Sequence, residues 1–340
     1  MEITQQSKSQ KKKLLIIDSH ALLHRAYHAL PALINSKGEP IGAIYGFASI
    51  LVSNIAQLKP DYLVACFDLP KPTIRHQKFA DYKAKRPKAP DDLIVQFKLV
   101  RRFLKNLDIP ILEKEGYEAD DAIGTVIAQV TQKYPDIENI VLTGDLDTLQ
   151  LINKNTKILT PKRGISDPIL YDEKELDKKY PGLEPKHIIE FKGLKGDQSD
   201  NIPGVPGIGE KTALTLIRQF GNLEKLYEIM ENDKEIERLK KEKILSNSVV
   251  NKLKENKDLA FFSRELATIY RDVPIEFNLK NASWEPNPVR VENALMDFGL
   301  RSLVRRYQAI SQGIELPKFE KKPEGKKEEK REPIRQNSLF

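Results

Sequence analysis

Short apolar runs alternate with amphipathic stretches over the first half of the chain. Three runs, residues 14–18, 62–68 and 139–145, are largely apolar, and they end at Asp18, Asp68 and Asp145. Runs of this kind are typical of buried parallel strands. Apolar positions at helical spacing lie between them, in residues 41–58, 92–104 and 120–130. The alternation predicts a right-handed, parallel α/β domain over residues 14–177.

The pattern changes after Tyr180 and Pro181. Residues 178–312 form a succession of short helical patterns separated by glycine, proline and asparagine, so we expect a second, all-α domain. Residues 1–13 form a basic N-terminal tail. Residues 313–340 combine dense mixed charge with proline and offer little to bury, which predicts disorder.

Composition narrows the class of protein. The chain has 340 residues, of which 40% are hydrophobic, and no apolar stretch approaches the roughly 20 residues of a membrane helix. The polar start is unlike a secretory signal, so a cytoplasmic protein is expected. Cys66 is the only cysteine, which excludes an internal disulfide and a multi-cysteine zinc site. We interpret Cys66 as a buried strand residue, and His20, His24 and His28 as one helix face rather than a zinc site.

Carboxylates gather where the predicted strands end and where the next helices begin. Ligands of open α/β sheets collect at this edge. Oxygen ligands without cysteine or histidine favour Mg²⁺ or Mn²⁺, and a pair of such ions can hydrolyse a phosphodiester without a protein nucleophile. Taken singly, acids in a first helical turn also suit the helix dipole, and that structural interpretation stays open. The nine candidate ligands are Asp18, Asp68, Glu118, Asp120, Asp121, Asp145, Asp147, Asp197 and Asp200.

Two further segments suit a polyanion, in a chain of net charge +7. Residues 70–90 carry seven lysines and arginines interleaved with aromatic side chains, a mixture that phosphate contacts and base stacking require. A solvated basic loop is the alternative. Residues 196–217 contain a glycine-rich turn that lacks the features of a Walker loop but exposes N–H groups to a phosphate. An ordinary turn between helices is the alternative here.

These segments closely resemble the 5′ nuclease family, which includes the 5′-3′ exonuclease domain of bacterial DNA polymerase I and flap endonucleases. The resemblance covers about residues 14–300. It implies a PIN-like (Rossmann-like) parallel sheet with a helical arch, followed by an all-α domain with a helix-hairpin-helix. The motifs are residues 15–30 (LIIDSHALLHRAYHAL), 38–47 (GEPIGAIYGF), 67–68 (FD), 79–87 (FADYKAKRP), 116–124 (GYEADDAIG), 143–151 (TGDLDTLQL) and 196–213 (GDQSDNIPGVPGIGEKTA).

The resemblance also implies roles for single residues. All nine acids match family metal ligands, with a first group around Asp18, Asp68, Glu118 and Asp120, a second around Asp145, Asp147, Asp197 and Asp200, and Asp121 near both. Catalytic roles are implied for Asp18, Asp68, Asp121, Lys83 and Arg86. K⁺ is expected at the hairpin. The implied DNA contacts are Arg25, Arg75, Tyr82, Lys83, Arg86, Lys195, Gly204, Gly207, Gly209, Lys211 and Thr212.

The chain departs from the family pattern at two positions near the first acid. Ser19 stands where glycine is common, and His24 where several relatives carry tyrosine, so stacking of the substrate end is expected to differ. No polymerase or proofreading segment follows, which suggests a stand-alone, monomeric nuclease. The terminal residues 336–340 (QNSLF) are similar to peptides that bind the bacterial sliding clamp, through Gln336, Leu339 and Phe340.

The function expected is metal-dependent cleavage of 5′ flaps, 5′ ends and RNA-primed ends of DNA during lagging-strand maturation and repair. Two alternatives remain. One is a non-catalytic protein that binds DNA junctions and the clamp. The other is an RNA-cutting enzyme of the wider PIN-like group, which shares the acidic cleft but has no need of a hairpin that grips DNA.

Overall fold

The computed structural model describes residues 11–35, 38–161 and 168–314, and the backbone of 334–335. Its main sheet has the order β4-β3-β1-β5-β6-β7, in which only β7 is antiparallel. The predicted parallel sheet is therefore confirmed, with an antiparallel edge strand added. The strands are β1 (Lys13–Asp18), β3 (Tyr62–Cys66), β4 (Ile111–Leu112), β5 (Glu138–Leu142), β6 (Thr156–Pro161) and β7 (Pro168–Tyr171).

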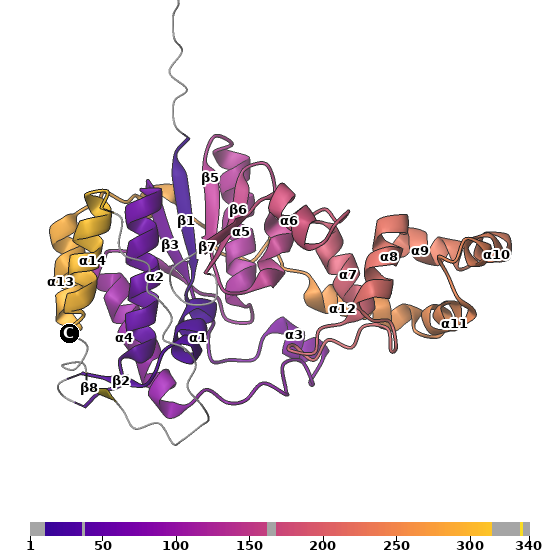
Figure 1. Cartoon of the computed structure of the whole chain (residues 1–340), viewed down its shortest axis with the longest axis horizontal. Helices are drawn as coiled ribbons and strands as arrows, with labels where there is room; N and C mark the ends of the chain where they lie inside the picture. Colours follow the sequence, from indigo (N-terminus) through magenta and orange to yellow (C-terminus); the bar gives the residue numbers. More distant parts are fainter. Residues whose placement is uncertain (1–10, 36–37, 162–167, 315–333, 336–340) are drawn as a thin grey trace, which may run out of the picture.

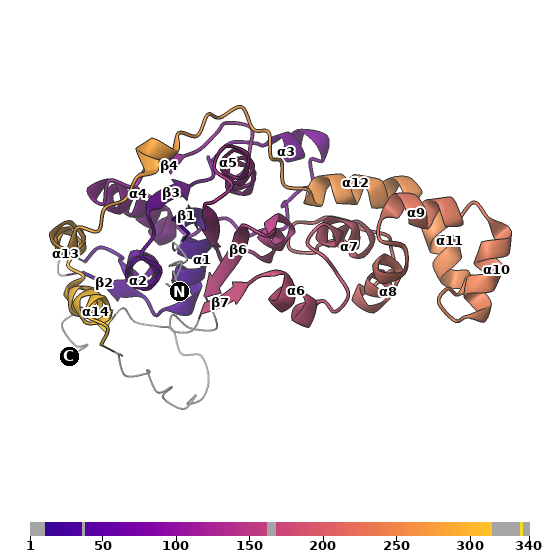
Figure 2. The same cartoon turned by 90° about the horizontal axis from the view of Figure 1, so that it is seen from above.

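The two faces of the sheet are covered by different helices (Figures 1 and 2). Alternate residues of β1 point to opposite sides: Leu15 and Ile17 join one apolar core, whereas Leu14 and Ile16 join the other. The first core is completed by α1 (Ser19–Ala29), α2 (Gly42–Leu58) and α4 (Asp91–Asn106), and the second by α5 (Ala119–Lys133), the 3-10 helix η1 (Leu146–Leu151) and α6 (Glu173–Lys179).

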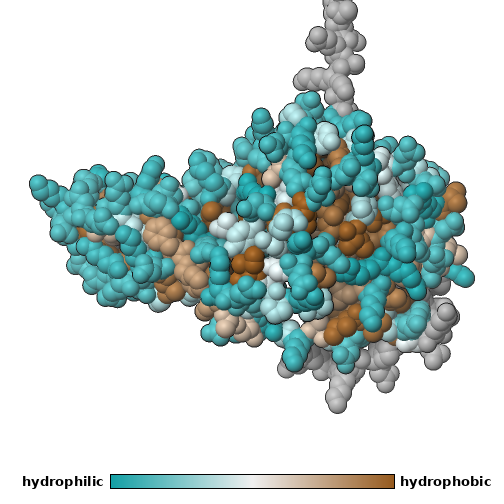
Figure 3. Space-filling view, turned by 180° about the vertical axis from the view of Figure 1, so that it is seen from behind, coloured by the Kyte–Doolittle hydropathy of each residue, from teal (hydrophilic) through white to brown (hydrophobic). Residues whose placement is uncertain are grey.

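The next helices form an arm that extends from the sheet (Figure 1), with a core of its own. Hydrophilic side chains dominate its surface on the face in Figure 3. α7 and α12 lie side by side at its base, and the segment from α3 (Ile74–Lys78) packs beside α12. The helices of the arm are α7 (His187–Lys195), α8 (Glu210–Phe220), α9 (Leu223–Ile229), α10 (Asp233–Lys241), α11 (Asn247–Glu255) and α12 (Lys257–Ala267).

The chain then returns to the sheet domain, which corrects the predicted boundary of the all-α domain. The N–H of Trp284 donates to the carbonyl of Asp61 over 2.8 Å. Leu295 and Leu303 are buried in the same core as α2, because α13 and α14 each present an apolar face to it. The returning elements are η2 (Leu279–Ala282), α13 (Pro288–Asp297) and α14 (Arg301–Ser311).

Most of the two predicted tails lies outside the described residues. Within 313–340, the backbone of β8 (Ile334–Arg335) pairs in parallel with β2 (Leu33–Ile34), so this short piece departs from the predicted disorder. Cys66 is free and buried on β3, as predicted. None of the helices in the described part of the chain combines the length and apolarity that crossing a bilayer requires.

Candidate active site at the carboxyl edge of the sheet

Four acids meet at the edge where β1, β3 and β5 end. Asp18 caps α1 and accepts hydrogen bonds from the N–H of Ala21 at 3.1 Å and from the hydroxyl of Thr143 at 2.5 Å. Asp68 follows β3 and accepts from the N–H of Ala119 at 2.7 Å, which ties it to the start of α5. Asp120 lies in the first turn of α5, and Asp145 caps η1 after β5.

The ionisation of these acids shows how close together they lie. Burial raises the pKa of Asp18 from 3.8 to about 7, against hydrogen bonds from Thr143 and Ala21 that lower it, and the charges of Asp68 and Asp145 raise it further. Burial also raises the pKa of Asp120, and the charges of Asp145 and Asp18 raise it further. Carboxylates that raise one another's pKa favour a bound cation, which would remove the repulsion.

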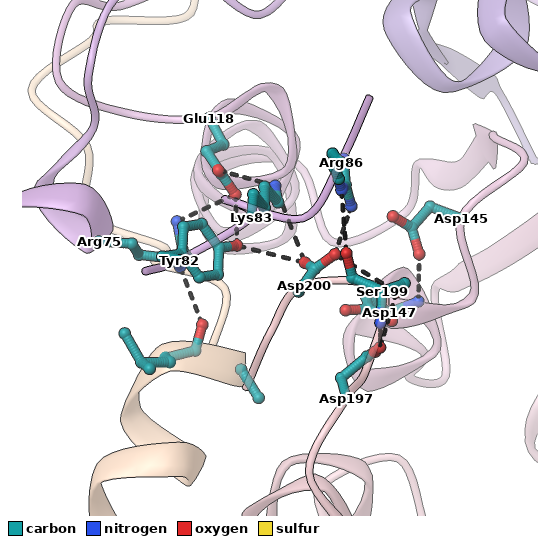
Figure 4. A network of polar contacts seen from close by, with 12 residues as sticks. Arg75, Tyr82, Lys83, Arg86, Glu118, Asp145, Asp147, Asp197, Ser199 and Asp200 are labelled. Atoms are coloured by element: carbon teal, nitrogen blue, oxygen red, sulfur yellow. Dashed lines mark hydrogen bonds and ion pairs between the residues drawn. The ribbon is translucent and has the colours of Figure 1, made fainter. Parts of the chain in front are cut away.

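A second group of acids is already neutralised by lysine and arginine (Figure 4). Lys192 of α7 forms ion pairs with Asp147 and with Asp197, the latter at 2.7 Å. Arg86 forms an ion pair with Asp200. Burial, followed by the charge of Asp145, raises the pKa of Asp147 to about 7. Burial acts in the same direction on Asp197, but Lys192 and Ser199 outweigh it and lower the pKa of Asp197 to about 2.

The segment before α4 reaches over this group. Lys83 adopts a left-handed backbone, with φ of 56°, and its ammonium lies 2.8 Å from Glu118 and 3.8 Å from Asp200. Residues 80–86 form turns between α3 and α4, so the implied helical arch is one short helix and turns rather than a continuous helix. The side chains of Lys83 and Arg86 therefore point at the acids from this segment.

The arrangement fits divalent cations without being closed around them. Among the described residues, no three carboxylate, histidine or cysteine groups already surround one point as a metal site. The donors are nevertheless carboxylate oxygens, and several of them repel one another at the same edge. The edge therefore offers the oxygen donors that divalent cations prefer. The role of each acid as a ligand stays a prediction.

Comparisons with known proteins match both parts of the chain. Residues 13–181 match the 5′-3′ exonuclease N-terminal resolvase-like domain, and residues 183–289 match the 5′-3′ exonuclease C-terminal SAM fold. The 5′-3′ exonuclease of Aquifex aeolicus is 35% identical, over 88% of this chain and 96% of the relative. The chain belongs to the 5′-3′ exonuclease family. Membership makes it a nuclease and confirms the resemblance.

Other relatives of this nuclease are larger or more distant. DNA polymerase I of Bacillus subtilis is 40% identical over 88% of the chain, but only 32% of the polymerase is matched. The nuclease thus spans about a third of its polymerase relatives. T5 5′-exonuclease with bound zinc shares the fold, at a TM-score of 0.59 and 20% identity over 88% of the nuclease and all of the T5 chain. The catalytic core of Rad2 with a DNA substrate gives 0.54 and 17%, over 89% and 92%.

The structure places Asp121 and Arg75 in one buried ion pair, and their roles as metal ligand and DNA contact stay predictions. Asp121 is fully buried, and both its oxygens accept hydrogen bonds from the Arg75 guanidinium, at 2.7 and 2.8 Å. Arg75 also donates to the carbonyls of Leu266 and Thr268, so it ties α3 and α5 to the end of α12. These contacts give both side chains a structural role at the junction of α3, α5 and α12.

Tyr82 lies inside the site, and its role as a DNA contact stays a prediction. Its ring is 3% exposed, and its hydroxyl donates to Glu118 at 3.1 Å or to Asp200 at 3.3 Å. It thus supports the acids from within. Arg25 of α1 lies against Gly144 and donates to the carbonyl of Pro161. The clamp-binding residues Gln336, Leu339 and Phe340 lie outside the described residues.

The predicted hairpin of the nuclease joins α7 to α8. Gly204 has φ of 62°, and a Cβ there would lie 2.3 Å from the N atom of Gly196. The two segments that meet in the turn therefore require glycine at both Gly196 and Gly204. Gly209 caps α8, whose N–H groups face outward beside the exposed Lys211 and the half-buried Thr212. Lys195 pairs with Glu210 at 3.4 Å across the same turn, and Gly207 lies against Lys252.

Lys192 was not predicted as a site residue, because its partner Asp147 lies 45 residues away in the sequence. One signal was available. Lys192 is flanked in α7 by Ile188, Phe191 and Leu194, and a lysine among buried positions of one helix needs a buried partner.

Proposed function

We propose that this nuclease hydrolyses DNA phosphodiesters at 5′ ends and 5′ flaps, including RNA-primed ends, with two Mg²⁺ ions at the acid edge. One observation supports the proposal. Among the described residues, acids at the strand ends that form no ion pair with lysine or arginine lie beside acids that do, and the lysine and arginine side chains of that second group could bind a phosphate instead. Bound Mg²⁺ would neutralise the phosphodiester and activate water. Mn²⁺ is expected to substitute for it.

The nuclease's own residues supply positioning. As the resemblance implies, Asp18, Asp68, Glu118 and Asp120 would surround one ion and Asp145, Asp147, Asp197 and Asp200 the other, with Asp121 near both. Lys83 and Arg86, which contact acids at the edge, would donate instead to the phosphate that enters there. The turn from Gly204 to Gly209 would hold the duplex through N–H groups and Lys211, with K⁺ as a further ligand of this hairpin.

The decisive experiment is cleavage of a 5′-labelled flap duplex in Mg²⁺ by the native nuclease, Asp120→Asn and Asp136→Asn. We expect Asp120→Asn to lower the rate at least about a hundredfold, because several kcal/mol of transition-state stabilisation depend on the ions. Asp136 lies before β5, at the opposite end of that strand, and provides a matched control. Equal rates for all three proteins would reject the site.

The same assay separates the alternatives. A native nuclease that binds the flap without cutting it would be the junction-binding protein. Preference for an all-RNA strand of the same sequence would support the RNA-cutting alternative. We expect cleavage of the DNA flap and of a strand with a short RNA 5′ end, because the hairpin is suited to duplex DNA.

A clamp contact is a further part of the proposal. Residues 336–340 (QNSLF) would bind the bacterial sliding clamp, and the charged residues before them would act as a tether. We infer that the nuclease works as a monomer in the cytoplasm, at the nucleoid. Deletion of 336–340 should abolish clamp binding in surface plasmon resonance without changing flap cleavage. Unchanged clamp affinity would remove this partner from the proposal.

A further inference from the structure

Lys192 occupies the centre of the second acid group. Its ammonium lies 2.7 Å from Oδ2 of Asp197 and also contacts Oδ1 of Asp147. These carboxylates come from different elements, the 3-10 helix η1 and the turn after α7. The lysine is 9% exposed, so the contacts are little screened by solvent. A single protein cation therefore bridges two proposed ligands.

The four acids at the strand ends, Asp18, Asp68, Asp120 and Asp145, have no lysine or arginine in an ion pair among the described residues. Within the part of the chain that the structure describes, Asp18, Asp120 and Asp145 form no ion pair, and Asp68 has only His20 at 3.5 Å. The two halves of the edge consequently differ in what an incoming metal ion meets. One half offers repelling carboxylates, whereas the other offers carboxylates that already hold a positive charge.

We propose that Lys192 competes with the second divalent ion for the carboxylates of Asp147 and Asp197. The ammonium of Lys192 must leave both carboxylates before both can bind the metal ion. This inference rests on the proposed function, because it assumes that these acids are ligands. It predicts unequal sites: the first ion binds tightly, and the second binds weakly because it displaces an ammonium. The lysine also keeps the metal-free acids from repelling one another.

Binding of Mn²⁺ without DNA tests the competition. Free Mn²⁺ is measured by electron paramagnetic resonance for the native nuclease, Lys192→Met, Lys192→Arg and Lys240→Met. Lys240 pairs with Glu237 at 2.8 Å on α10, so its loss changes the net charge equally but far from the edge. Lys192→Met should tighten the weaker site on the order of tenfold, and Lys192→Arg and Lys240→Met should stay near native. Unchanged or weaker binding by a folded Lys192→Met would overturn the proposal.

A second measurement uses the native nuclease and does not depend on the variant folding. Lysines are reductively methylated with and without saturating Mg²⁺, and the extent at each lysine is read by peptide mass spectrometry. Displacement predicts a severalfold increase at Lys192 on adding Mg²⁺, with Lys240 unchanged. Equal or lower labelling of Lys192 would reject displacement. Both measurements omit DNA, so their failure is distinct from a failure to cleave.

Discussion

At the scale of single residues, the acid edge is divided by which carboxylates have a cationic partner. Asp147, Asp197 and Asp200 share Lys192 and Arg86, whereas Asp18 and Asp120 respond to one another's charge. A shared partner does not set the ionisation of an acid, because Asp147 and Asp197 both contact Lys192 and yet the pKa of Asp147 is raised to about 7 and that of Asp197 is lowered to about 2. pH therefore separates individual acids rather than the two groups.

Asp18→Asn should stabilise the metal-free nuclease more at pH 8 than at pH 5. The pKa of Asp18 is raised from 3.8 to about 7 in the fold, so the folded state binds a proton that the unfolded chain has lost, and its stability falls as pH rises through this range. Asparagine removes that loss. One pKa unit is about 1.4 kcal/mol, enough to move Tm by several degrees.

The test is thermal unfolding in EDTA across pH 5 to 8, read as the Tm difference between variant and native. The pKa values of His20 and His24 are lowered by burial, which makes both proteins gain stability with pH, so only the difference isolates Asp18. A difference that does not grow with pH would contradict the raised pKa. Excess Mg²⁺ should reverse its sign.

The buried pair of Asp121 and Arg75 leads to a different prediction. Asp121→Asn leaves the buried guanidinium of Arg75 with only the longer contact to Glu118, at 3.4 Å, and should cost about 3 kcal/mol of unfolding free energy. Mn²⁺ binding without DNA should stay native. The double variant Arg75→Met/Asp121→Asn should lose less than the sum of the singles in denaturant titration. Native stability with lost Mn²⁺ binding would return Asp121 to the metal site.

The sequence predicted where the acids are, and it could not predict what they touch. Strand ends place Asp18, Asp68 and Asp145 at one edge by topology alone. The partners depend on tertiary packing, since Lys192 meets Asp147 across 45 residues and Arg75 meets Asp121 across 46. Asp121 follows Asp120 in the same family motif, but in α5 the side chain of Asp121 is buried against Arg75.

At the scale of elements, the hairpin between α7 and α8 depends on glycine at one position and not at another. Gly204→Ala forces a left-handed residue and a contact of 2.3 Å with Gly196, so it should cost at least about 1–2 kcal/mol and weaken binding of duplex DNA. Gly209→Ala meets no atom within 4 Å and should be tolerated. Thermal unfolding and fluorescence anisotropy would measure both effects; equal behaviour of the two variants would contradict this account.

Periodicity predicted the long elements well because they bury one continuous face. Helices α2, α4 and α5 lie within a few residues of the expected ranges. The two-residue strand β4 and the antiparallel β7 were not predicted, since they are short and their identity comes from their neighbours. Residues 80–86 form turns where the resemblance implied a helical arch. In these turns Lys83 and Arg86 contact Glu118 and Asp200.

At the scale of the whole molecule, α13 and α14 belong to the catalytic core. A chain ending after residue 314 should unfold like the native nuclease, whereas one ending after residue 282 should lose cooperative unfolding, because Leu295, Leu300 and Leu303 leave a core they fill. Circular dichroism on heating distinguishes the two. A cooperative transition in the shorter chain would show that the sheet stands without these helices.

This boundary was missed because helical periodicity reports that a face is buried but not against which partner. The amphipathic pattern of residues 288–311 is equally consistent with either core. Only the backbone bond from Trp284 to Asp61 and the packing of α14 on α2 decide between them. Because residues 288–311 follow the arm in the sequence, they were assigned to the arm rather than to the sheet domain.

The return of α13 and α14 has a consequence for biosynthesis. The sheet's first strand is made early, yet the core that it faces is completed only by Tyr307, after the entire arm has been translated. A ribosome therefore presents the arm as a self-contained unit while the half that carries the acids is still open. Until α14 emerges, the nascent nuclease has an unfinished catalytic half, and its folding waits for residues that are translated after the arm.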